Sequence, residues 1–114
     1  MEKKTFNNKR IVLNLALNYG SKEEILNAFK IFFKGKRKNI TIEKFEKNLY
    51  TKNIPDPDLM IRTGGTKRLS NFLLWQLAYA EIFFVNKLWP EFNENDYYKI
   101  IKKFYKIKRN FGKI

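Results

Sequence analysis

The sequence predicts an α/β fold, because short apolar runs alternate with amphipathic stretches of helical period. Residues 11–17 form a near-continuous apolar run, which is typical of a parallel strand buried on both faces. Two more short apolar runs, at residues 59–62 and 82–85, each follow a stretch of helical pattern. Strands separated by helices indicate a parallel β-sheet flanked by helices, in a single domain over residues 1–114.

The first helix is expected directly after residues 18–20. Ser21 and Glu24 have the spacing of a capping box, in which each residue would satisfy a free backbone N–H group at the helix start. Gly35 is predicted to end this helix. Its core-facing stripe comprises Ile25, Leu26, Phe29, Phe32 and Phe33.

A second helix is expected after Thr41, whose hydroxyl can cap the helix N-terminus. The prolines of residues 54–58 predict a rigid turn before the strand at residues 59–62. The inward-facing residues of this second helix are predicted to be Ile42, Phe45 and Leu49.

The rest of the chain predicts a helix over residues 71–79, the strand at 82–85, a turn at 89–92 and a final helix capped by Asn93. The buried side chains of the final helix are predicted to be Tyr97, Ile100, Ile101 and Phe104. Lysines crowd its C-terminal half, where they suit the helix dipole, and Gly112 is predicted to end it.

The composition excludes several kinds of chemistry. The chain has no cysteine and no histidine, which rules out disulfides, zinc–cysteine sites and a histidine-based catalytic relay. Catalysis would therefore depend on carboxylates, cations, hydroxyls or a hard metal ion. No apolar run is long enough to span a bilayer and the N-terminus lacks an apolar signal core, so we expect a cytoplasmic location.

A net charge of +13 suggests a polyanionic partner such as a nucleic acid, an acidic membrane or a phosphate substrate. However, the cations are nineteen lysines and five arginines, and asparagine, isoleucine, phenylalanine and tyrosine are also abundant. This joint bias is typical of AT-rich codons, so we attribute most of the charge to composition. Arginine is therefore the informative cation in this sequence.

Two of the five arginines, Arg62 and Arg68, lie six residues apart around the pair Gly64-Gly65, and Ser70 follows. An arginine fork suits phosphate oxygens, and glycine lets backbone N–H groups approach a ligand. This loop follows a predicted strand, as does the polar stretch at residues 18–21. Ligands bind beyond the carboxyl ends of parallel strands, so both segments are expected at one edge of the sheet.

Residues 56–65 and 68–81 closely resemble the cis-prenyltransferases, with bacterial undecaprenyl diphosphate synthase as the nearest match. Further similarity lies at residues 15–20, 88–92 and 109–112, so that the resemblance runs from about residue 12 to residue 112. It implies the C-terminal half of that fold, an incomplete domain with a partial parallel sheet. The implied reaction is condensation of isopentenyl diphosphate onto an allylic diphosphate, with Mg²⁺.

The resemblance also implies roles for single residues. Arg62, Arg68 and Ser70 would hold isopentenyl diphosphate, and Glu81 would support the magnesium ion. Arg109 is a candidate for an intersubunit contact. Site shaping is implied for Asn18, Gly64 and Gly65. The implied partners are a second copy of the chain or a missing N-terminal half, with peripheral membrane contact through the prenyl product and no nucleic acid.

The chain departs from the family in three respects. The N-terminal motif, with its catalytic aspartate and glycine-rich loop for the allylic diphosphate, is absent, so we expect the chain to be inactive alone. Thr66 stands where bacterial members usually carry glutamate. Asn110 stands where the family has an arginine that reaches the substrate of the neighbouring subunit.

Structural alternatives remain open for these residues. Surface arginines commonly form ion pairs, a carboxylate such as Glu81 in an apolar run can be structural, and Ser70 can cap a helix. Asn18 and Tyr19 can simply shape the end of a strand. At the level of function, the alternatives are a non-catalytic partner subunit or decayed gene remnant, and, ranked last, a basic nucleic-acid-binding protein.

Overall fold

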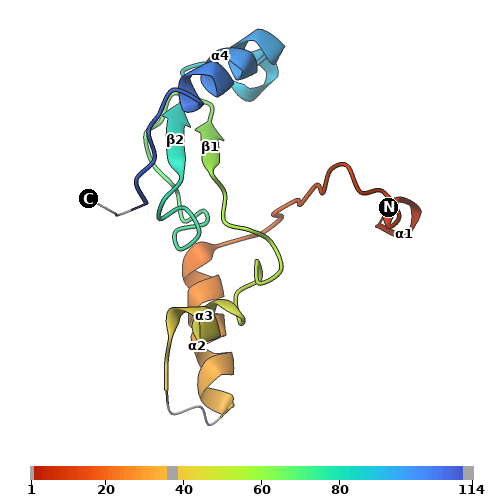
Figure 1. The fold of residues 1–114 in the computed structure, drawn as a ribbon, viewed down its shortest axis with the longest axis vertical. Coiled ribbons are helices and arrows are strands. Elements are labelled where there is room, and N and C mark those ends of the chain that lie inside the picture. Colours follow the sequence, from red (N-terminus) through yellow and green to blue (C-terminus); the bar gives the residue numbers. More distant parts are fainter. Residues whose placement is uncertain (1, 36–38, 112–114) are drawn as a thin grey trace.

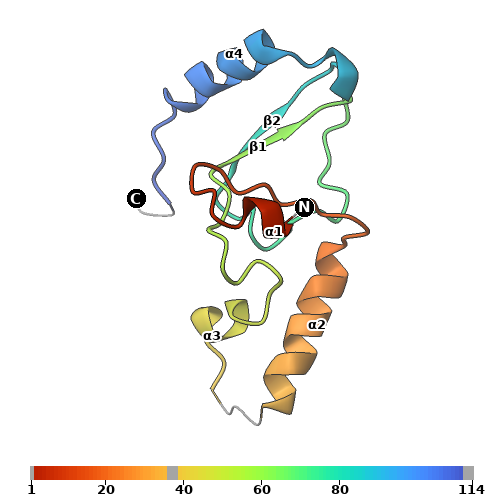
Figure 2. The ribbon, with the colours of Figure 1, turned by 90° about the vertical axis from the view of Figure 1, so that its right-hand side faces the viewer.

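The computed structural model describes residues 2–35 and 39–111, and the predicted helix end at Gly112 lies outside the described residues. Both views place α4 at one end of the molecule, α2 and α3 at the other, and the two strands between them (Figure 1, Figure 2). The elements are α1 (Glu2–Thr5), α2 (Ser21–Lys34), α3 (Ile42–Glu46), β1 (Leu59–Arg62), β2 (Glu81–Phe84), the 3-10 helix η1 (Trp89–Glu91) and α4 (Glu94–Phe104).

Strands β1 and β2 form a parallel two-stranded sheet, which confirms the α/β class. In the register, Leu59 pairs with Glu81 at the start of the strands and Arg62 pairs with Phe84 at their end. The radius of gyration is 16.9 Å, whereas a compact domain of this length has about 13 Å. The molecule is therefore open, with a small sheet and much apolar surface facing solvent.

The predicted strand at residues 11–17 is wrong for this structure. The segment is extended but pairs with no described strand, and Ile11 and Leu17 are 82% and 83% exposed. In Figure 1 it runs away from the two-stranded sheet towards α1. A strand forms only where a neighbour supplies backbone partners, and the described residues supply none to this segment.

Helix α2 begins and ends where the sequence predicts, with Gly35 as its C-terminal cap. The predicted capping box is wrong, because the N-cap is Gly20 and the side chains of Ser21 and Glu24 are buried instead. Of the predicted apolar stripe only Phe32 is buried, while about half of the Leu26, Phe29 and Phe33 side chains is exposed. The stripe is uncovered because α2 packs on a small cluster of Ala28 with Phe45, Leu49, Ile25 and Trp75.

The caps of α3 and α4 are confirmed. The Thr41 hydroxyl accepts a hydrogen bond from the backbone N–H of Lys44, 3.3 Å away. Asn93 and Asp96 form a reciprocal capping box at the start of α4. The predicted inward faces hold only in part: Phe45, Leu49 and Ile100 are buried and Ile101 and Phe104 half-buried, but Ile42 and Tyr97 are exposed.

Residues 71–79 do not form the predicted helix but a series of turns. Ser70, Asn71 and Leu73 have φ angles of 52°, 62° and 44°, in the left-handed region. A right-handed helix cannot include such residues, so the backbone leaves helical geometry where the chain meets α2. Within the described part of the chain, no helix has both the length and the apolar character needed to cross a membrane.

Candidate functional site

Arg62 lies at the carboxyl end of β1, where the predicted anion loop begins. Its Nε donates to Thr66 Oγ1 at 3.1 Å and its Nη1 donates to Ser70 Oγ at 3.2 Å. The structure therefore brings together Arg62 and Ser70, two of the three residues predicted to hold a diphosphate. Both partners of this guanidinium group are neutral hydroxyls.

The backbone N–H groups of the glycine pair are hydrogen-bonded within the chain. Gly64 and Gly65 have φ angles of 90° and 72°, which favour glycine. Their N–H groups donate to the backbone oxygens of Lys87 (2.8 Å) and Val85 (3.0 Å). These bonds fold the loop onto the segment after β2 and occupy both N–H groups. An anion at this edge would therefore be held by side chains.

Arg68 is exposed on the same loop. Among the described residues, no carboxylate forms an ion pair with Arg62 or Arg68. Neither guanidinium charge is therefore neutralised by an ion pair with a described carboxylate. That arrangement favours binding of an anion from solution.

The start of α2 bonds to residues that come just after the arginine loop, although the strand at residues 11–17, which was expected to bring residues 18–21 to the sheet edge, does not form. Ser21 N donates to Asn71 O at 2.8 Å, and Lys22 N donates to Asn71 Oδ1 at 2.8 Å. Leu74 N donates to Ser21 Oγ at 2.9 Å. The N-terminus of α2 is therefore bonded directly to the residue that follows Ser70.

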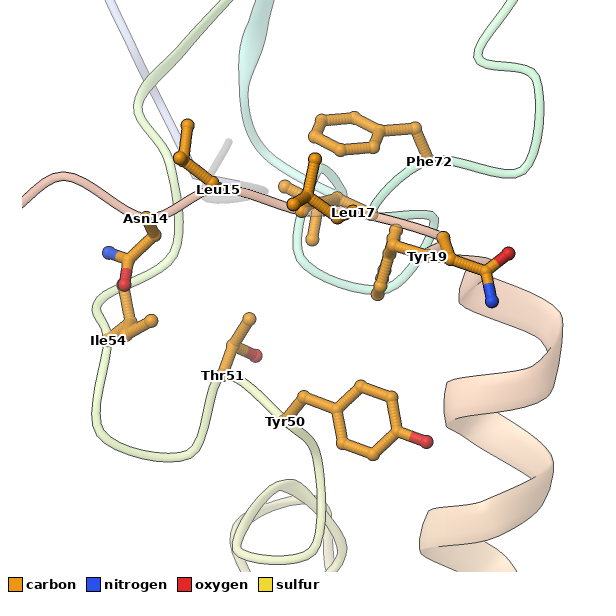
Figure 3. Close-up of a pocket in the computed structure, with 11 residues that line it drawn as sticks. Asn14, Leu15, Leu17, Tyr19, Tyr50, Thr51, Ile54 and Phe72 are labelled. Atoms are coloured by element: carbon orange, nitrogen blue, oxygen red, sulfur yellow. The ribbon is translucent and has the colours of Figure 1, made fainter. Parts of the chain in front are cut away.

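An apolar pocket of about 410 Å³ lies beside the start of α2 (Figure 3). Asn18, with a left-handed φ of 50°, and Tyr19 contribute to its wall. Burial, followed by the hydrogen bond that its hydroxyl donates to Glu24, raises the pKa of Tyr19 to about 12. Tyr19 therefore stays neutral and acts as a donor here. The pocket is lined by residues 14–19, Tyr50, Thr51, Ile54, Phe72 and Leu73.

A buried polar network behind this pocket was not predicted. The fully buried carboxylate of Glu24 accepts from Tyr50 N at 2.8 Å and from Gln76 Nε2 at 3.2 Å. Gln76 Nε2 also donates to Thr51 Oγ1 at 2.9 Å. Gln76 interrupts an apolar run, and that interruption was the only sequence signal of the network. The network fixes α2 against residues 50–51 and 76.

Glu81 and Arg109 meet at the opposite edge of the sheet. Arg109 pairs with Asp58, and its Nε lies 3.9 Å from Glu81 Oε1. Its guanidinium carbon is also 4.4 Å from the centre of the Phe111 ring. Three residue pairs of the register separate Glu81 from Arg62, which corresponds to roughly 10 Å along the strands. The structure therefore does not bring Glu81 to the arginine loop.

Residues that could hold a metal ion are sparse. No group of three or more acidic, histidine or cysteine side chains is arranged for a metal within the described ranges. Glu81 has Arg109 as its neighbour, and a guanidinium group beside a carboxylate opposes metal binding. The described donor set does not by itself fit a magnesium ion.

The chain belongs to the prenyltransferase family described as "Putative undecaprenyl diphosphate synthase", whose model matches residues 1–112. Isoprenyl transferases of Oceanobacillus iheyensis and Fusobacterium nucleatum are 50% and 48% identical to it. These matches cover 97% and 98% of this chain but 46% and 48% of the relatives. The chain thus spans about half the length of the curated relatives it matches, consistent with the predicted C-terminal half.

The solved structures that match this chain are likewise covered over about half of their length. A probable undecaprenyl diphosphate synthase from Campylobacter jejuni matches with a TM-score of 0.84 and 42% identity, over 98% of this chain and 52% of that one. Lavandulyl diphosphate synthase from Lavandula x intermedia, solved in complex with dimethylallyl diphosphate, matches with a TM-score of 0.89 and 37% identity, over 98% of this chain and 51% of that one. The open two-stranded fold is therefore similar to part of a larger α/β enzyme.

Proposed function

We propose that this chain is the isopentenyl-diphosphate-binding part of a cis-prenyltransferase, whose reaction condenses that substrate with an allylic diphosphate. Arg62, Arg68 and Ser70 would hold the diphosphate group. The observation that carries the proposal is the pairing of Arg62 with Ser70 at the carboxyl end of β1, in a loop where neither arginine pairs with a described carboxylate. Family membership supports the class of reaction.

The geometry suits a ligand that carries several anionic oxygens. The two hydroxyls bonded to Arg62 lie 3.1 and 3.2 Å from its nitrogens, at the long end of such contacts. Charge-assisted bonds to phosphate oxygens are shorter and roughly twice as strong as neutral ones. A diphosphate would therefore compete well for Arg62 while accepting a further bond from the Ser70 hydroxyl.

Magnesium would supply charge neutralisation for the leaving diphosphate when bound. The proposed ligand Glu81 lies at the far edge of the sheet and faces Arg109. We therefore expect Glu81 to serve a metal only together with groups from outside the described chain. Likewise, we expect the catalytic aspartate motif to come from the half of the fold that the relatives have in addition, so that this chain is inactive alone.

We expect this chain to associate with another polypeptide, because the apolar segment at residues 11–17 is exposed. The relatives are about twice as long as this chain, and their other half is the partner that we propose for this segment. A homodimer is the second form of association. A cytoplasmic location, with peripheral membrane contact through the prenyl product, belongs to the same proposal.

The same exposed segment favours one alternative, a non-catalytic partner subunit. Such a subunit would also need a complementary chain, but the complex would not need this arginine loop for turnover. The two proposals separate on Arg62→Ala in a reconstituted complex. A catalytic half loses prenyl transfer with this variant, and a non-catalytic partner does not.

The central experiment is calorimetric titration of the 114-residue chain with inorganic pyrophosphate and with isopentenyl diphosphate, each with Mg²⁺. We expect Arg62→Ala and Arg68→Ala to weaken binding by about 10- to 100-fold each, since each removes charge-assisted bonds worth about 1.5–3 kcal/mol. Lys67→Ala is the matched control, because it removes one charge from the same exposed loop. It should change affinity by less than about threefold.

Two results would contradict the proposal. One is no binding by the wild-type chain, either alone or co-expressed with the N-terminal part of the Fusobacterium nucleatum relative. The other is equal weakening by Lys67→Ala and the arginine variants, which would indicate attraction to net charge.

A further inference from the structure

We propose that Asn71 is a positioning residue that holds Ser70 in the diphosphate site by fastening it to the first turn of α2. This inference rests on the proposed function of the Arg62–Ser70 site and adds a residue that the family resemblance did not assign. We call the set of bonds between Asn71 and residues 21–23 the Asn71 clamp.

The clamp uses both the backbone and the side chain of Asn71. The Asn71 carbonyl accepts from Ser21 N, and its side-chain Oδ1 accepts from Lys22 N, both at 2.8 Å. The other end of the amide, Nδ2, donates to Glu23 Oε2 at 3.0 Å. This last bond is the main cause of the lowered pKa of Glu23. Three consecutive residues of α2 are thus hydrogen-bonded to one residue of the loop.

The clamp supplies a cap that α2 otherwise lacks. The first N–H groups of a helix have no partner within the helix, and a side chain at the N-cap usually accepts from one of them. Here the N-cap is Gly20, which has no side chain to accept a bond. Asn71 provides two acceptors in its place, so the helix and the loop depend on each other.

The backbone around Ser70 shows why it needs such support. Ser70 and Asn71 have left-handed φ angles of 52° and 62°. Asparagine adopts this region more readily than other residues with a side chain, whereas serine there is less favourable. Because Asn71 is fixed, Ser70 is held in this conformation with its Oγ 3.2 Å from Arg62 Nη1. Without the clamp, the loop would relax and Ser70 would leave the arginine.

Gly20 shows how closely the two segments approach. A Cβ atom at this position would lie 2.1 Å from Glu23 Oε2 and 2.9 Å from Asn71 Nδ2. Its φ of −139° is ordinary, so what favours glycine there is the closeness of the Glu23 and Asn71 side-chain ends, which a larger residue would push aside. The polar stretch at residues 18–21 thereby acquires a function, since Gly20 and Ser21 leave space and bonds for the loop that carries Ser70.

The test reverses the direction of one hydrogen bond. Asn71→Asp replaces the donor that faces Glu23 with an oxygen, so that two carboxylates repel each other. Glu23→Gln in the same chain restores a donor and returns the net charge to that of the wild type. In titrations of the 114-residue chain with inorganic pyrophosphate and Mg²⁺, we expect Asn71→Asp to weaken binding by about tenfold or more, because Ser70 is misplaced. The double variant should recover to within about threefold.

A second measurement and a second variant keep the outcome clear. Hydrogen exchange at the Leu74 amide, which donates to Ser21 Oγ, should speed up in Asn71→Asp and slow again in the double variant. Asn71→Gly keeps the left-handed backbone and the carbonyl cap but removes both side-chain bonds, so it should also weaken binding, and the lost side-chain cap should lower the melting temperature by no more than a few degrees.

The inference is overturned if the wild type binds pyrophosphate and both Asn71 variants bind it equally well, or if the double variant stays as weak as Asn71→Asp. A wild-type chain that binds no pyrophosphate, whether alone or together with the N-terminal part of the Fusobacterium nucleatum relative, overturns the proposed function, and this inference with it. The two failures are therefore distinguished by the wild-type titration.

Discussion

The two edges of the sheet hold the same kind of side chain in opposite situations. At the carboxyl edge, the Arg62 guanidinium group donates to the hydroxyls of Thr66 and Ser70 and forms no ion pair with a described carboxylate. At the amino edge, Arg109 faces the carboxylates of Asp58 and Glu81 and donates to a backbone oxygen. Both guanidinium groups are partly covered by the chain, so their difference lies in the charge of their partners.

Because of this difference, Arg62 is suited to binding an anion, whereas Arg109 is suited to stabilising the fold. A cation already neutralised by two carboxylates gains little from a diphosphate, whereas a cation bonded to hydroxyls gains a full set of charge-assisted bonds. The sequence motif around Arg62 and the C-terminal Arg109 both resemble functional arginines of the family. Of these two arginines, only Arg62 can accept an anion without first breaking an ion pair to a described carboxylate.

The largest expected effect concerns the amino edge. Arg109→Met should lower the free energy of unfolding by about 2 kcal/mol, since it removes the bond to Tyr79 O and leaves Asp58 and Glu81 unpaired. The expected loss of unfolding free energy is modest because Asp58 is largely exposed. Urea unfolding measures the change, and pyrophosphate affinity should stay unchanged.

Arg68→Met is the matched control, because it removes the same charge from an exposed position without a described ion pair. It should change the unfolding free energy by less than about 0.5 kcal/mol. Equal destabilisation by the two variants would show that the edges do not differ as described.

The next largest effect is expected when a carboxylate is placed beside the arginine at the carboxyl edge, as carboxylates lie beside Arg109 at the amino edge. Thr66→Glu puts a carboxylate where Arg62 Nε now finds a hydroxyl at 3.1 Å. An exposed ion pair is worth up to about 1 kcal/mol, so without metal the variant should bind pyrophosphate about fivefold more weakly. Thr66→Gln, measured by the same titration, should bind like the wild type. Tighter metal-free binding by Thr66→Glu would contradict the comparison.

The smallest effect concerns an ion pair beside the loop. Lys87, whose carbonyl accepts from Gly64 N, also pairs with Asp96 at 2.8 Å, and the hydrogen bond from Lys87 lowers the pKa of Asp96. A carboxyl group whose pKa falls on folding stabilises the fold above its unfolded pKa, and that stabilisation is lost as the pH falls through the folded pKa.

The melting temperature of the wild type should therefore exceed that of Asp96→Asn at about pH 5, and this gap should narrow as the pH falls below about 4, the ordinary pKa of an aspartate. The asparagine variant keeps an acceptor for Asn93 N, so it isolates the charge. A gap that persists at the lowest pH would show that charge is not its cause.

The sequence predicted those parts of the fold that depend on local energetics. Thr41 and Asn93 cap their helices as expected, because a cap needs only its own first turn. The strand at residues 59–62 also follows from a short apolar run after a proline turn. In contrast, residues 71–79 adopt a conformation set by contacts with α2, and residues 11–17 lack the neighbouring strand that they would need among the described residues, neither of which a local pattern reveals.

The candidate site shows the same difference between features that depend on local sequence and features that depend on distant contacts. Arg62 and Ser70 were predicted to bind the same diphosphate, and they contact each other because only a short loop separates them. The position of Glu81 depends on the register between β1 and β2, and the register places it at the far edge. The contacts of Asn71 with α2 could not be read from the sequence either, since they join residues 49 positions apart.

The long sequence separation between α2 and Asn71 has a consequence for folding during translation. Helix α2 leaves the ribosome with a bare glycine at its start, and its substitute cap at Asn71 is not yet synthesised. At about 5–20 residues per second, the helix waits roughly 2–10 s for that cap. The first turn of α2 therefore gains its cap only after Asn71 has been made, and the loop that carries Ser70 can be fastened to α2 only from that moment.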